Sequence, residues 1–122
     1  MRIWLILAGL MGAEAVICGA ISAHADLTDY GRELIEKAAQ YEVWHALALI
    51  GVAILAKEKS RIILAAGIFF TLGVSLFCGT LYVKGFWEFT LFPMSAPLGG
   101  TCLILGWLCL AAYGVKKQQP PA

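Results

Sequence analysis

The sequence predicts an all-α integral membrane protein, folded as a four-helix antiparallel transmembrane bundle with a short amphipathic extension before its second helix. Of its 122 residues, 61% are hydrophobic and 14% are charged, and the mean hydropathy is +0.81. A soluble domain is about 45–50% apolar and about 25% charged. A core of this size cannot bury the excess apolar surface. We therefore expect lipid rather than water around a single domain that comprises residues 1–122.

Four apolar segments are long enough, alone or with their flanks, to cross a bilayer. A helix needs about 20 predominantly apolar residues to span the hydrocarbon core. The expected spans cover residues 3–23, 41–56, 62–83 and 97–113. The formal net charge is only +1, and the chain has no long basic run. This balance gives no indication of a nucleic-acid partner.

The first span, residues 3–23, contains a single charged residue, Glu14, near its middle. Small residues recur there at four-residue steps, and Gly19 and Ala23 belong to a ridge that suits close helix contact. A secretory signal peptide is an alternative, because Arg2 precedes the segment and an Ala-x-Ala sequence ends it. The length of the segment and the glutamate within it favour a retained span.

The charged residues of the chain are concentrated in residues 26–42, just before the second span. Apolar residues recur there at helical spacing, and Asp29 is placed to cap the helix N-terminus. The apolar residues that follow are too few to cross a ~30 Å core at about 1.5 Å per residue. We therefore expect one helix that continues into the span and places Tyr41, Glu42 and His45 in or just below the interfacial layer.

The second half of the chain predicts two further spans joined by an aromatic loop. A basic turn leads into the third span, which is free of charge and contains Gly79. Residues 85–96 are rich in aromatic side chains, which is typical of an interfacial loop. Gly99 and Gly100 follow in the last helix and are candidate helix-packing positions.

The distribution of Lys and Arg predicts the orientation. The side that holds both termini and the basic turn contains six of these residues, and the other side contains three. The positive-inside rule therefore predicts a multi-pass protein with both termini in the cytoplasm.

Ordered motifs along most of the chain carry a resemblance to a known family. They are GAISAH at 19–24, YEVWHALAL at 41–49, LFCGTLY at 76–82, APLGG at 96–100 and GW at 106–107. With these motifs the chain resembles the membrane family of unknown-function domain 423, whose animal members are called transmembrane protein 256.

The resemblance implies a four-helix protein of the bacterial inner (plasma) membrane and implies no particular activity. Three positions depart from the family pattern. Glu42 stands for the usual Gln, Cys78 for Ser and Ala96 for Thr. These departures argue against a chemical role for the three side chains.

The two histidines are candidate ligands. His24 ends the first span and His45 opens the second, so the predicted topology puts both near the outward face. Two imidazoles on adjacent helices could bind haem, a quinone or a metal. The simpler interpretation, which we favour, is that each forms a hydrogen bond that fixes helix packing. Glu42 and His45 also have the Glu-x-x-His spacing of diiron bundles, but the second pair that such sites need is missing.

Glu14 is a second candidate, because an ionisable residue within a membrane span is a functional suspect. It could be protonated and hydrogen-bonded to Thr71 or Ser75 of the third span. It could instead relay protons or cations toward His24, or face the helix of a partner protein.

The cysteines carry no recognisable site. Cys18, Cys78, Cys102 and Cys109 all lie in apolar segments, without a Cys-x-x-Cys pair, and we interpret them as packing residues.

The sequence therefore favours a non-enzymatic accessory or assembly subunit of a membrane complex. We assign no catalytic residue, no metal ligand and no cofactor, with haem bound through His24 and His45 as the less favoured alternative. The expected partners are the lipid bilayer and other membrane-protein subunits. A proton or small-solute carrier that uses Glu14 and His24 is the main alternative function.

Overall fold

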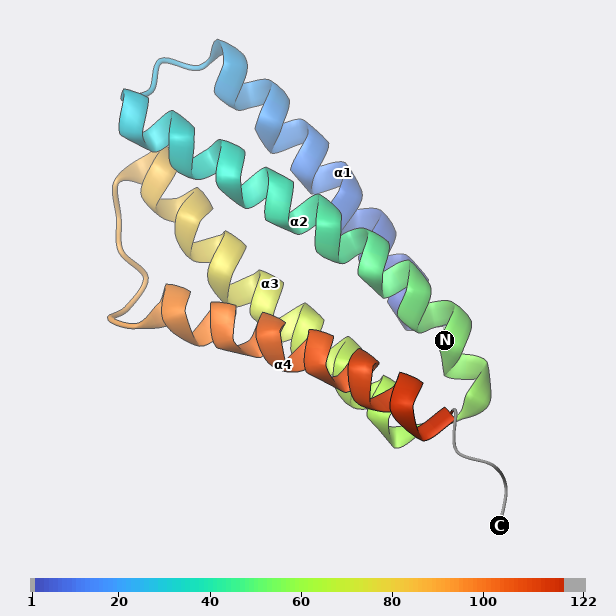
Figure 1. Cartoon of the computed structure of the whole chain (residues 1–122). Helices are drawn as coiled ribbons and strands as arrows, with labels where there is room; N and C mark the ends of the chain where they lie inside the picture. The colour runs from blue at the N-terminus through green and yellow to red at the C-terminus, as the bar shows by residue number, and fades with distance from the viewer. Residues whose placement is uncertain (1, 118–122) are drawn as a thin grey trace.

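A computed structural model describes residues 2–117 of the chain, and these form four long helices (Figure 1). The helices are α1 (Arg2–His24), α2 (Asp29–Leu55), α3 (Arg61–Trp87) and α4 (Ser95–Lys117), and a short 3₁₀ helix, η1 (Ala56–Glu58), follows α2. Each of the four is long and apolar enough to cross a membrane. They run alternately up and down, so that α1 starts and α4 ends at the same end of the bundle. The predicted all-α, four-span architecture is confirmed.

The helix ends differ in detail from the sequence prediction. Thr28, not Asp29, caps α2, because its Oγ1 accepts a 2.9 Å hydrogen bond from the Gly31 amide. Asp29 is instead the first helical residue, where its negative charge still favours the helix N-terminus. The aromatic loop is also shorter than residues 85–96, since α3 continues to Trp87 and ends at Glu88 in a left-handed conformation.

Consecutive helices pack against each other along the bundle. Buried residues make up 39% of the most apolar stretch of α2 and of α3, but only 22% in α1 and 17% in α4. The molecule is therefore built on a central α2–α3 pair that α1 and α4 flank. At the end near η1, Lys117 Nζ forms a 2.8 Å ion pair with Glu58 Oε2 and links α4 to the turn after α2.

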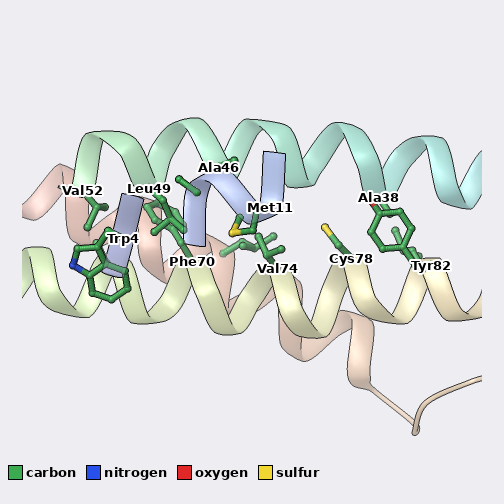
Figure 2. Packing of buried hydrophobic residues seen from close by; sticks show 14 of the residues in the cluster. Trp4, Met11, Ala38, Ala46, Leu49, Val52, Phe70, Val74, Cys78 and Tyr82 are labelled. Carbon is green, nitrogen blue, oxygen red and sulfur yellow. The ribbon is translucent and has the colours of Figure 1, made fainter. Parts of the chain in front are cut away.

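The interior between α1, α2 and α3 is filled by apolar side chains (Figure 2). Leu49 and Phe70 are completely buried there, and Trp4 of α1 reaches the same layer. Many large apolar side chains point outward instead, among them Leu10 and Leu47. Such an exposed apolar surface is unfavourable in water and is what a lipid-facing bundle needs.

Glycine allows the closest helix contacts. A Cβ atom at Gly99 would overlap the backbone of Phe77, and one at Gly106 would lie 2.7 Å from the Phe70 ring. These positions let α4 approach α3 closely. Between α2 and α3, a Cβ atom at Gly85 would lie 2.6 Å from the Ile35 side chain.

Candidate functional site

The candidate site begins with Glu42, which lies at the middle of α2 and not at its end. It is only 2% exposed. The hydroxyl group of Tyr82 on α3 donates a 2.7 Å hydrogen bond to its Oε1. Glu42 is thus enclosed within the bundle, which the sequence had not indicated. It is enclosed because α2 packs in the bundle over the turns before Glu42 as well, with Ile35 and Ala38 completely buried.

His45 lies one turn further along α2 and uses both of its ring nitrogens. Its Nδ1 lies 2.6 Å from the carbonyl oxygen of Tyr41, and its Nε2 accepts a 3.0 Å hydrogen bond from the indole N–H of Trp107. This pairing assigns the proton to Nδ1, so the imidazole is neutral and donates to the helix backbone. The bond to Trp107 connects α2 directly to α4.

The structure does not bring the two histidines together. His24 is exposed and ends α1 beside the start of α2, whereas His45 lies more than four turns further along α2. With both nitrogens of His45 occupied, this arrangement offers haem no pair of free imidazoles. Glu42 and His45 also contact different helices, α3 and α4, so they do not point at a common metal position. Within residues 2–117, no three His, Cys, Asp or Glu side chains are grouped to hold a metal ion.

Glu14 lies at the middle of α1 and is exposed on the side of the bundle. It shares a cavity of about 240 Å³ with Glu42, and the two carboxyl groups are near neighbours there. Thr71 and Ser75 line the same cavity, but their hydroxyl groups donate to backbone carbonyl oxygens of α3, each at 2.8 Å. Among residues 2–117, neither hydroxyl forms the expected hydrogen bond with Glu14.

A larger groove of about 740 Å³ separates α2 from α4. Trp44 and Leu47 of α2 and Ile104 of α4 lie on its rim and are exposed. The hydrogen-bonded pair of His45 and Trp107 lies where the two helices meet. The groove faces outward and is open to the surroundings of the bundle.

Sequence reasoning missed two residues of this site, Tyr82 and Trp107. They lie 40 and 62 positions from their partners Glu42 and His45. Both stand in motifs that carry the family resemblance, LFCGTLY and GW, and this was the available signal. Their pairing could not be read from the sequence, because it depends on how each helix is rotated.

The predicted helix-packing residues differ in their surroundings. Gly99 makes the close contact with Phe77, and Gly100 has only the Phe77 ring nearby, 3.9 Å from where its Cβ would be. At Gly19 and Gly79 a Cβ atom would meet no atom within 4 Å, and Ala23 is exposed.

Comparisons with known proteins identify relatives that are named membrane proteins. A family model described as "Protein of unknown function (DUF423)" matches residues 18–100. The UPF0382 membrane protein YwdK of Bacillus subtilis is 31% identical over 121 residues, which cover 95% of this chain and 98% of YwdK. The UPF0382 membrane protein SH2409 of Staphylococcus haemolyticus is 33% identical over 90% of this chain and 93% of its own length.

A third relative is a UPF0382 membrane protein of Haemophilus influenzae, 29% identical over 95% of each chain. No solved structure gives a significant match.

Proposed function

Because the chain belongs to the DUF423 family of membrane proteins, whose function is unknown, we propose its role from the placement of its own residues. We propose that it is a small accessory or assembly subunit of a larger membrane complex. The observation that carries this proposal is the exposure of Glu14 at the middle of α1.

An ionisable side chain that faces lipid at the centre of a span is unfavourable. An ionised side chain there costs about 2.5–3.5 kcal/mol on insertion scales. Within residues 2–117, no hydroxyl or basic side chain hydrogen-bonds to Glu14; its polar neighbour is another carboxyl group, that of Glu42. A helix of another membrane protein that supplies a basic or hydrogen-bonding group at this depth would remove the cost.

A second face of α1 is also suited to a partner. Gly12 and Gly19 have no atom within 4 Å of where a Cβ would lie. Small residues in this position let another helix approach the backbone closely, and dispersion contacts then drive association in lipid. This supports the same role without assigning the partner's identity.

Purification from the native membrane tests the proposal. We expect tagged wild-type protein to carry a defined partner that mass spectrometry identifies, and Glu14→Leu to lose it. The matched control is Thr101→Val, which also removes an exposed polar group, but from α4. A strictly monomeric wild-type protein, or equal retention of the partner by Glu14→Leu, would contradict the proposal.

A second candidate function is that of a proton or small-solute carrier that uses Glu14 and His24. The cavity that Glu14 shares with Glu42 favours it, because a path across the bilayer needs polar groups beside open space. His24 lies at the end of α1, about 15 Å from Glu14 at 1.5 Å per residue. Proteoliposome fluxes decide the question: equal rates for wild type and Glu14→Gln would exclude this carrier mechanism.

For the location we propose the inner membrane of a bacterium, with both termini in the cytoplasm. The support is the excess of Lys and Arg on the side of the termini and the basic turn. Bacterial relatives that are named membrane proteins support the same location.

A further inference from the structure

The groove between α2 and α4 has the size and position of a ligand site. Its volume of about 740 Å³ lies within the range of 300–1,000 Å³ that is typical of small-molecule sites. The groove exists because α2 and α4 are not consecutive helices, and α4 packs mainly on α3. Since it opens on the outer surface of a membrane-embedded bundle, an occupant can enter it from the bilayer.

The walls of the groove determine which lipophile fits. No charged residue lines it, so a charged head group would find no counter-ion. Four aromatic side chains do line it, namely Tyr41, Trp44, Phe77 and Trp107. The Tyr41 ring lies 5.0 Å from Phe77 and 5.2 Å from Trp44, centroid to centroid. These rings pack against one another, and their outer faces and edges remain available to a flat ring that lies in the groove.

One polar group in the groove is left for a ligand. His45 and Trp107 satisfy each other, and the Thr101 hydroxyl donates to the carbonyl of Pro97. The hydroxyl group of half-buried Tyr41 has no hydrogen-bond partner within the described part of the chain. The hydroxyl oxygen is not enclosed by the protein, so a molecule in the groove can reach it. A ligand with a carbonyl oxygen would accept this hydrogen bond.

From these observations we propose that the groove binds a prenylated quinone. The quinone ring would stack among the aromatic side chains, one carbonyl oxygen would accept from the Tyr41 hydroxyl, and the isoprenoid tail would continue into the lipid. This site does not require His24, and it is independent of the partner surface at Glu14. A phospholipid acyl chain is the competing occupant, but it offers no ring to the aromatic side chains.

Tryptophan fluorescence in lipid nanodiscs tests the proposal with a short-chain ubiquinone analogue as probe. We expect the quinone to quench the tryptophan fluorescence of the wild-type protein in a saturable way. In Trp44→Phe the amplitude of this saturable quenching should be reduced at least twofold. It should be unchanged in Trp87→Phe, which removes an exposed tryptophan outside the groove. Tyr41→Phe should weaken the apparent affinity about fivefold, as expected for one lost hydrogen bond.

A pair of glycine variants on α4 separates groove binding from simple partition into the bilayer. Gly100→Leu places a side chain in the groove, and its Cβ would contact only the Phe77 ring, at an ordinary distance. Gly114→Leu adds the same side chain at an open position outside the groove. We expect Gly100→Leu to abolish saturation and Gly114→Leu to preserve it. Linear quenching that is equal in all variants would overturn the proposal. So would saturable quenching by brominated phospholipid acyl chains together with none by the quinone.

Discussion

The hydroxyl group of Tyr82 donates a 2.7 Å hydrogen bond to Oε1 of Glu42 and thereby joins α3 to the middle of α2. Both side chains are buried, with exposures of 7% and 2%. They meet because a helical side chain leans toward the N-terminus of its helix, and α2 and α3 run antiparallel. A polar pair of this kind holds the two central helices in one rotation and one register, because other arrangements would leave the carboxyl group without its donor.

The first prediction concerns this pair. Tyr82→Phe should lower the free energy of unfolding by about 1–2 kcal/mol, because it removes the donor and leaves a buried carboxyl group. Denaturant titration in detergent micelles measures the change. Tyr113→Phe is the control, since Tyr113 lies on the last turns of α4 and its hydroxyl makes no hydrogen bond within residues 2–117. A double-mutant cycle with Glu42→Leu should show coupling, and additive effects would refute the pairing.

The second prediction concerns the histidine that joins α2 to α4. Nitrogen NMR of the protein in micelles should find His45 neutral and protonated at Nδ1, because Nε2 accepts from Trp107. Trp107→Phe removes that donor and should shift the Nε2 resonance of His45. It should also lower the free energy of unfolding by about 1 kcal/mol. Trp87→Phe should leave the resonance unchanged. A proton on Nε2 in the wild-type protein would contradict the assigned hydrogen bonds.

The third prediction concerns the closest contact between α3 and α4. Gly99→Ala places a Cβ atom against the backbone of Phe77, which cannot rotate away. We expect a loss of about 1–3 kcal/mol, as for other overpacked sites. Gly114→Ala on the same helix has open space and should be neutral or slightly stabilising, since alanine favours helix. Equal stability of the two variants would mean that α4 packs differently.

The fourth prediction concerns topology. In a variant with the four native cysteines replaced by alanine, Thr90→Cys lies in the loop between α3 and α4, and Lys57→Cys lies in η1. A membrane-impermeant maleimide added to intact cells should label the first and not the second, because the proposed orientation places the basic turn in the cytoplasm. After permeabilisation both should react. The reverse pattern would invert the proposed orientation.

Much of the fold could be predicted from composition and spacing. The four spans, their alternation and the helix that continues from the charged segment into the second span follow from apolar length and helical period. The predicted helix ends were less accurate. Thr28 and Asp29 are both good capping residues, and only the backbone geometry selects between them. The end of α3 was missed because aromatic residues are typical of both interfacial loops and helix ends.

By itself, the sequence determined that this protein is embedded in a lipid bilayer. With 61% hydrophobic residues in a chain of 122, much apolar surface stays outside the core and must contact lipid. The sequence also identified Glu14, Tyr41, Glu42 and His45 as unusual residues. Only the tertiary structure decided that Glu42 pairs with Tyr82 and His45 with Trp107 while His24 lies apart. The reason is geometric: spacing along a helix places a residue on a face, but which face meets which neighbour depends on how all four helices rotate and pack together.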